Sequence, residues 1–382
     1  MDWQQHAERL ADQVSDPDSR WLAPVAHTAR HELVPRWWEY DGQAEMWLVR
    51  DGASDPEAWA RVAYSDVSVV TRVGARHADH GTPGDYADGL ATSSSTLPSL
   101  VVRMLRHGRL GDGLSLLDLG TGAGGLTAYA ARRLGDRHVT SIDVDPYLTE
   151  AAAERLARMG LHPTFYAVDA TAEIPGRYDR IICTVAIRPG TGLRTVLGAL
   201  HEGGRLVTTL AGTSLILTGW KDQNGELVGR IERDWAEFML TRSGQDYPPA
   251  LAKLFKLADQ EAGDHVTTGR YPVLDVANAW EVRSMLEVTT PGVQYRYTTR
   301  GKRRTLLLVH RDGSWARAIG DWTDPPTVHE GGPRRLWDAL ERIRSRLNVE
   351  GGLPLYGADA RVTPDGVVRL SRGQWRGTLG EE

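Results

Sequence analysis

The chain has 382 residues, more than one domain usually holds, so we expect a core domain with additional modules. Its 41% hydrophobic and 25% charged residues are typical of a globular protein rather than a disordered one. A net charge of −5 and the lack of any long apolar run exclude a general attraction for nucleic acid and a membrane span. The single cysteine, Cys183, and a polar N-terminus without signal-peptide character predict a cytoplasmic protein.

The first part of the chain, residues 1–90, is predicted to form an N-terminal region of helices and short strands. An amphipathic pattern that begins at Trp3 indicates the first helix. The runs MWLVRDG (46–52) and VSVVTRVG (67–74) are rich in β-branched and aromatic residues and end in turn residues, so they predict strands.

Residues 91–212 alternate strand and helix patterns, which predicts a Rossmann-like, doubly wound α/β fold with a parallel sheet. Short apolar or β-branched runs indicate five strands, at 114–120, 138–144, 164–170, 178–186 and 204–210. Helical patterns follow the first two strands, at 126–134 and 148–160.

Residues 213–382 are predicted to form an appended α+β module. Two apolar arms around Asn224-Gly225 indicate a β-hairpin. The runs DWAEFMLTR (234–242) and RRLWDALERIRSRL (334–347) predict helices, and strand patterns lie between them.

A glycine-rich turn follows the first predicted strand of the middle region, with Gly120, Thr121, Gly122 and Gly124 ahead of a helix. Glycines let a ligand approach the backbone, and the start of a helix offers unpaired N–H groups. The spacing also satisfies the dinucleotide fingerprint, so a nicotinamide-dependent oxidoreductase remains an alternative at this point, as does a tight turn without a ligand.

Three acids at the ends of successive strands favour S-adenosylmethionine as the cofactor. The carboxylate of Asp118 can bind the ammonium of a bound amino acid. Asp143 can accept hydrogen bonds from both ribose hydroxyls, and Asp169 can accept one from the adenine amine. NAD has no such ammonium, although any one of these acids could instead cap a helix. The predicted cofactor site comprises Asp118, Gly120, Thr121, Gly122, Gly124, Asp143, Val144, Asp169 and Ala170.

Five motifs resemble the protein-L-isoaspartate O-methyltransferase family over residues 28–212: RHELVP (30–35), SSTLP (94–98), LLDLGTGAGG (116–125), VTSIDVD (139–145) and YDRIICTVA (178–186). Leu33 stands where the family has Phe, and Gly125 where it usually has Tyr. The resemblance implies an S-adenosylmethionine-dependent carboxyl O-methyltransferase. It also places Thr96 on the family's hydroxyl residue beside the reactive methyl group.

Stretches in the C-terminal module resemble the methyltransferases that accompany ATP-grasp ligases in graspetide biosynthesis: FMLTRSGQDYPP (238–249), SWARA (314–318), GGPRRLWD (331–338) and RVTPDG (361–366). This resemblance implies that the module recognises a ribosomally made, cyclised precursor peptide. The implied reaction esterifies an aspartate side chain, and the ester then collapses to an aspartimide. Alternatives are a lanthipeptide-associated or repair-type protein-L-isoaspartate methyltransferase and, further away, a non-catalytic peptide-binding protein.

The chemistry of a carboxylate acceptor fits the residues available. Aspartate is ionised at pH 7, so it needs no general base, and the enzyme's task is to align it and to exclude water. We expect the hydroxyls of Ser94, Ser95 and Thr96 to steer the acceptor oxygen, although they could instead cap a helix that begins at Pro98. We predict no metal site.

Overall fold

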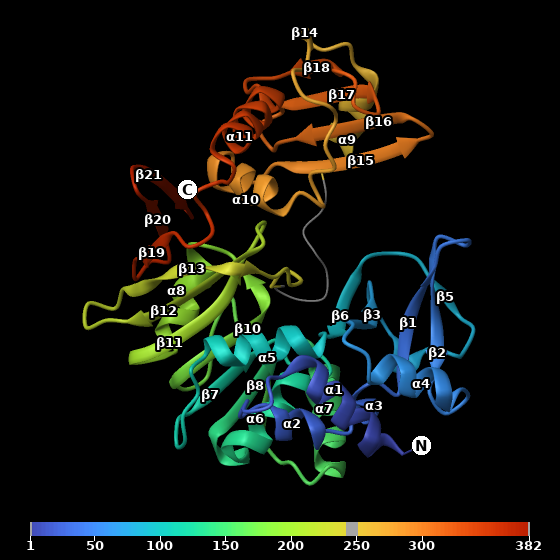
Figure 1. Cartoon of the computed structure of the whole chain (residues 1–382), viewed down its shortest axis with the longest axis vertical. Helices are drawn as coiled ribbons and strands as arrows, with labels where there is room; N and C mark the ends of the chain where they lie inside the picture. The colour runs from blue at the N-terminus through green and yellow to red at the C-terminus, as the bar shows by residue number, and fades with distance from the viewer. Residues whose placement is uncertain (1, 242–250, 381–382) are drawn as a thin grey trace.

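The computed structural model describes residues 2–241 and 251–380. Its largest sheet has ten strands, and Figure 1 shows how the helices and the other sheets are arranged around it. Five neighbouring strands are parallel, and their order of 3-2-1-4-5 along the chain is that of a Rossmann-like sheet. These strands are β9 (Thr164–Ala167), β8 (Val139–Asp143), β7 (Leu116–Leu119), β10 (Tyr178–Ile187) and β11 (Leu200–Leu210). The predicted α/β class and the five predicted strands are confirmed.

Helices bury both faces of this parallel half. Successive side chains of a strand point to opposite faces, so Leu116 and Ile182 pack on one side while Leu117 and Ile181 pack on the other. The core on the side of Leu116 and Ile182 also includes apolar residues of α5 (Pro98–His107), α6 (Gly125–Leu134) and α7 (Pro146–Arg158). The core on the side of Leu117 and Ile181 includes apolar residues of α8 (Thr191–Gly198). The short helix η2 (Asp136–His138) links α6 to β8. The strands therefore present their carboxyl ends between two covered faces.

The other half of the sheet is antiparallel and uses the end of the chain. The predicted hairpin at Asn224-Gly225 is confirmed by β12 (Leu215–Lys221) and β13 (Leu227–Trp235). Next to them lie β19 (Asp359–Val362), β20 (Val368–Arg372) and β21 (Trp375–Leu379). One sheet thus runs across the predicted boundary at 212/213, and the division into three domains stays a prediction.

The N-terminal region forms a second sheet, in the order β4-β3-β1-β2-β5 with β6 also paired to β3. Its strands are β1 (Arg36–Asp41), β2 (Met46–Asp51), β3 (Val69–Val73), β4 (Arg76–His77), β5 (Tyr86–Ala87) and β6 (Ala91–Ser95). Its helices are α1 (Trp3–Val14), α2 (Leu22–Ala26), α3 (Arg30–Leu33), α4 (Pro56–Ala63) and the short η1 (Ala78–His80). The last strand, β6, carries part of the predicted hydroxyl cluster to the central domain.

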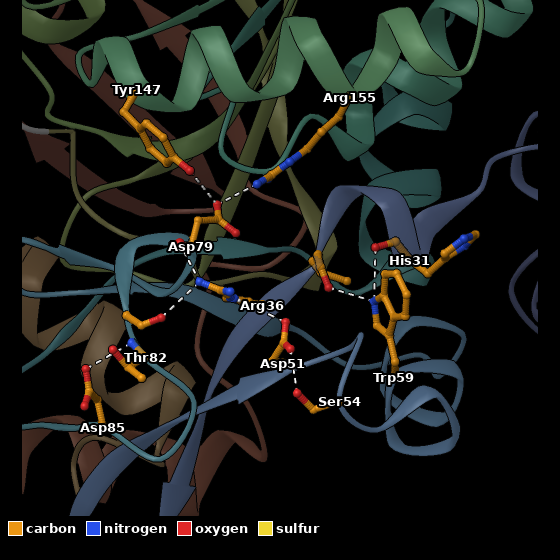
Figure 2. A network of polar contacts seen from close by, with 12 residues as sticks. His31, Arg36, Asp51, Ser54, Trp59, Asp79, Thr82, Asp85, Tyr147 and Arg155 are labelled. Carbon is orange, nitrogen blue, oxygen red and sulfur yellow. Dashed lines mark hydrogen bonds and ion pairs between the residues drawn. The ribbon is translucent and has the colours of Figure 1, made fainter.

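A polar network fixes this second sheet against α7 (Figure 2). The carboxylate of Asp79 accepts hydrogen bonds from Tyr147 (2.9 Å) and Arg155 (2.5 Å), both on α7. Arg36 on β1 donates to the backbone carbonyl of Asp79 at 3.0 Å. Arg155 is almost fully buried and also donates to the carbonyl of Leu33, so the contact is an integral part of the core.

The remaining residues form a five-stranded antiparallel sheet in the order β14-β18-β17-β16-β15. Its strands are β14 (His265–Thr268), β15 (Gln294–Arg300), β16 (Arg303–Val309), β17 (Trp315–Asp321) and β18 (Thr327–Gly331), with helices α9 (Ala252–Gln260), α10 (Trp280–Thr289) and α11 (Leu336–Glu350). The helix predicted at 334–347 is confirmed by α11. Within the described ranges, no helix has the length and apolar character needed to cross a bilayer.

The helix predicted at 234–242 is wrong. Strand β13 extends to Trp235, and the following residues leave the hairpin without helical hydrogen bonds. The amide of Ala186 donates to the carbonyl of Met239 at 2.8 Å, and the amide of Thr241 donates to Ala186 at 3.1 Å. This stretch therefore pairs with the end of β10. Residues 242–249 of the stretch that resembles graspetide enzymes lie outside the described residues.

Candidate cofactor and acceptor site

A cavity of about 270 Å³ opens at the carboxyl ends of the parallel strands. Its walls include β6 with the residues after it, the glycine turn after β7, the residues at the ends of β8, β9 and β10, and, as a further wall, the stretch 237–241. Of the predicted site residues, those that line the cavity are Ser94, Ser95, Thr96, Gly120, Thr121, Gly122, Asp143, Val144 and Ala170. The fold therefore brings the predicted cofactor turn and the predicted acceptor hydroxyls to one space.

Two glycines of the turn are required by close approach. Gly122 has φ +50°, and a Cβ built on it would lie 3.1 Å from the carbonyl oxygen of Ser94. Gly120 has φ +103°, and its Cβ would lie 2.8 Å from Val185 Cγ1. A side chain at either position would push apart the walls of the cavity.

Gly124 serves packing instead. It precedes α6 with φ +88°, and its Cβ would meet Ala152 and Leu156 of α7 at 3.2 Å. It does not line the cavity, so its part in the predicted site would be to bring α6 close to α7.

Asp143 at the end of β8 is held by backbone donors. The amide of Gly122 donates to its Oδ2 and the amide of Asp145 to its Oδ1, each at 3.1 Å. These bonds orient a carboxylate at the cavity wall beside Val144. An oriented carboxylate at this strand end suits a pair of ribose hydroxyls.

Asp118 is fully buried and does not line the cavity. Its Oδ2 accepts hydrogen bonds from Thr127 (2.6 Å) and Ser141 (3.3 Å), whereas its buried Oδ1 has no hydrogen-bond partner among the described residues. Burial raises the pKa of this carboxyl to about 7. Its contact with the ammonium of the cofactor stays a prediction.

Asp169 lies next to the cavity, between Val168 and Ala170, which line it. Its Oδ1 accepts hydrogen bonds from the amide (2.9 Å) and the hydroxyl (2.6 Å) of Thr171. This geometry is that of a local side-chain turn, and no helix begins directly after Asp169 in the described structure, so the residue does not act as a helix cap. Its contact with adenine also stays a prediction.

The three hydroxyl residues do not cap α5. The cap position of that helix is Leu97, which makes no side-chain capping bond. The amide of Leu97 donates to Ser68 Oγ at 3.1 Å, and the amide of Ser99 donates to Asp66 at 2.8 Å. In the described structure, therefore, the hydroxyls of Ser94, Ser95 and Thr96 are not used to begin the helix.

A buried arginine fixes the backbone of this cluster. Arg30, from the RHELVP motif, is only 2% exposed. Its Nη2 donates to the carbonyls of Ser95 and Thr96, both at 3.3 Å, and its Nη1 donates to Ala63 at 2.7 Å. Further bonds reach Ser65 and Val67. Charge-assisted bonds to several loops make Arg30 a positioning residue for the hydroxyl strand, which is β6 together with Thr96.

The further wall, residues 237–241, was not predicted from the sequence. It consists of Glu237, Phe238, Met239, Leu240 and Thr241, which the pairing with Ala186 brings over the cavity. Arg283 on α10 fixes its start by donating to Glu237 at 2.9 Å. No local signal indicates this wall, because both contacts join residues that are far apart in the sequence.

The lining also limits the chemistry. Among the described residues that line the cavity, the only ionisable side chains are Asp143 and Glu237. Asp143 is oriented by backbone amides, and Glu237 is paired with Arg283. The described lining thus offers hydroxyls and apolar surface but no histidine or lysine, which suits an acceptor that is already a nucleophile at neutral pH.

Comparison with known proteins identifies the kind of domain that the parallel half of the sheet forms. Residues 116–204 match the family model described as "Methyltransferase domain", so this segment is a methyltransferase domain and S-adenosylmethionine is its cofactor, as the strand-end acids predicted. The chain is 33% identical over 136 residues to the ribosomal protein L11 methyltransferase of Dechloromonas aromatica, covering 33% of this chain and 45% of that protein. It is 30% identical over 158 residues to that of Thiobacillus denitrificans, covering 39% and 47%.

The chain thus spans about half the length of these curated relatives. A similar solved structure is a protein-L-isoaspartate O-methyltransferase with 15% identity and a TM-score of 0.49, covering 99% of this chain and all of that one.

Proposed function

We propose that this chain methylates an aspartate side-chain carboxylate in a ribosomally made, cyclised peptide of the graspetide type. The observation that carries the proposal is the contact between two motifs of different parts of the chain. The carbonyl of Ser94 lies against Gly122 so closely that a Cβ there would be 3.1 Å away. This contact supports a single site built from the hydroxyl strand and the cofactor turn.

The cofactor would be held by Gly120, Gly122, Asp143, Val144 and Ala170, all of which line the cavity. When bound there, S-adenosylmethionine supplies a methyl group activated by its positively charged sulfur. The bare backbone at the two glycines provides room for it, and the oriented carboxylate of Asp143 provides acceptors for hydroxyl groups.

The acceptor would be placed by β6. A carboxylate can take hydrogen bonds from the hydroxyls of Ser94, Ser95 and Thr96, whose backbone Arg30 holds in place. Phe238, Met239 and Leu240 cover the cavity with apolar surface and reduce the hydration of the acceptor. Orientation of this kind is worth on the order of 7–11 kcal/mol in well-aligned reactions.

The product would be an aspartate methyl ester. An ionised carboxylate would have to expel oxide, whereas the ester expels methoxide, so the next backbone nitrogen can attack the ester carbonyl and its proton leaves with the methoxide as methanol. Loss of methanol closes a succinimide, and this second step needs no residue of the enzyme.

The proposal is tested with a graspetide precursor, in its cyclised and its linear form, and isotope-labelled S-adenosylmethionine. We expect base-labile label on the cyclised peptide, because a preformed ring avoids part of the ordering entropy of binding. Equal labelling of both forms would contradict the preference for a cyclised acceptor. Label that resists mild base would contradict the carboxylate assignment.

A further inference from the structure

A second cavity, of about 330 Å³, is lined by charged side chains: Arg103, Arg106, His107, Arg109, Arg205, Arg230, Glu232 and Asp234. Five arginines and two acids face one space in a chain whose net charge is −5. This local excess of positive charge is opposite in sign to that of the whole protein, so it requires an explanation of its own.

Three of the arginines have acidic partners. Arg103 is 3.2 Å from Asp234, Arg230 is 2.9 Å from Glu232, and Arg106 is 3.3 Å from Asp16. Within the described part of the chain, Arg109 and Arg205 form no ion pair, although the charge of Glu232 acts on Arg205 from a longer distance.

Arg205 is the buried arginine of the cluster, at 5% exposure. Its Nε donates to the carbonyl of His107 at 2.6 Å, and its guanidinium lies over the ring of Trp220, 5.0 Å from the centroid. Its two terminal nitrogens make no hydrogen bond to any described residue. Burial, together with the nearby charges of Arg109, Arg180 and Arg230, lowers the pKa of Arg205 to about 10. A buried guanidinium that is held in place and has unused N–H donors can donate hydrogen bonds to an oxyanion.

Arg109 has an unfavourable backbone conformation. It follows α5 with φ +49°, a left-handed conformation that glycine adopts without strain. Its carbonyl accepts a hydrogen bond from Arg180. The strained arginine therefore adds a cation to a space that already holds several.

Helix α5 joins the arginine cavity, lined by the residues just named, to the cofactor cavity, and the arginine cavity lies toward the amino ends of β10 and β11, where Arg205 pairs with Arg180. Leu100, Arg103 and His107 share one face of α5. Leu100 lines the cofactor cavity, whereas Arg103 and His107 line the arginine cavity. The helix rises about 10 Å between Leu100 and His107. Asp234 and Glu237, three residues apart, connect the two cavities a second time.

We propose that the arginine cavity binds an acidic side chain of the same polypeptide whose aspartate is methylated. This inference rests on the proposed function, since it takes the occupant of the first cavity to be a peptide. An extended chain advances about 3.3 Å per residue, and the rise of about 10 Å along α5 is the least that the peptide must span, so the acidic residue should lie at least about three residues from the methylated one. A guanidinium recognises carboxylate and phosphate alike, so the test must separate a peptide acid from free phosphate.

The binding test uses calorimetry on the full chain without a methyl donor. The probes are blocked tetraglutamate, blocked tetraglutamine and inorganic pyrophosphate. We expect submillimolar binding of tetraglutamate that weakens with salt, and none of tetraglutamine. Arg109→Gly should raise the melting temperature yet weaken tetraglutamate binding at least fivefold. Glu45→Gly is the matched control, because Glu45 also has a left-handed backbone (φ +53°) and lies in the turn between β1 and β2 of the N-terminal sheet. It should leave binding unchanged.

Unchanged binding by Arg109→Gly, or equal binding of the two peptides, would overturn the inference. Binding of pyrophosphate without tetraglutamate would overturn the peptide assignment. Since no methyl donor is present, a failure of the proposed methyltransfer leaves this measurement unaffected. Methylation of an acceptor by a chain that does not bind tetraglutamate would refute the arginine cavity alone.

Discussion

Gly122→Ala tests whether the contact between β6 and the glycine turn matters for the site. The new methyl group would lie 3.1 Å from the carbonyl oxygen of Ser94, so strand β6 would have to move by a few tenths of an ångström. The left-handed backbone adds strain of about 1 kcal/mol. Since a misplacement of 1 Å can cost about a hundredfold in rate, we expect a methyltransfer rate about tenfold lower.

Gly74→Ala is the matched control for this change. Gly74 has φ +53°, close to the +50° of Gly122, but a Cβ on it meets no atom within 4 Å. Both variants should lose about 1 kcal/mol of unfolding free energy, and only Gly122→Ala should also lose methyltransfer and S-adenosylhomocysteine affinity. Thermal unfolding, calorimetry and a methylation assay separate the two effects. Equal activity of the two variants would refute the idea that this contact shapes the site.

Three further changes probe other parts of the site. Asp143→Ala should weaken S-adenosylhomocysteine binding about 10- to 100-fold in calorimetry, because a charged acceptor of two hydroxyls is lost; unchanged affinity would remove Asp143 from the site. Arg30→Met should lower the free energy of unfolding by about 3 kcal/mol in urea titrations, since it leaves several buried carbonyls without donors; a loss below about 1 kcal/mol would contradict this. Burial raises the pKa of Asp118 to about 7, so the folded state binds more protons than the unfolded one, and the stability of the apo-protein should fall from about pH 4 to 7. Asp118→Asn should flatten that slope, and an identical pH profile for both proteins would refute the shift.

The local parts of the fold could be predicted from the sequence. The run around Asp118 is apolar and short and ends in glycines, which indicates a buried strand and a tight turn without further information. The hairpin at Asn224-Gly225 carries an equally local signal. Gly120 and Gly122 were expected because a ligand approaches the backbone there, whereas the atoms that the structure places against them are those of Val185 and Ser94.

The remaining features depend on contacts between distant residues. The apolar residues after Trp235 have helical spacing, but Ala186 offers them a free strand end, and tertiary pairing prevails over the local pattern. The return of β19–β21 to the central sheet is equally invisible in the local sequence. Spacing along the chain also cannot show that the carboxyl group of Asp118 lies beneath the turn, bonded to Thr127, rather than at the cavity wall.

The order of mass changes in a cyclised precursor peptide tests the central claim most directly. The wild-type chain should first make the peptide heavier by one methylene group and then lighter by one methanol, so that it ends one water lighter than it began. Thr96→Val keeps the side-chain volume but removes one hydroxyl of the cavity, so it should slow the first change and leave the second unaltered. Hydroxylamine should trap the final product, because a succinimide is an electrophile. A methyl group that remains on the peptide as a stable mark, with no later loss of methanol, would contradict the assignment of a carboxylate acceptor.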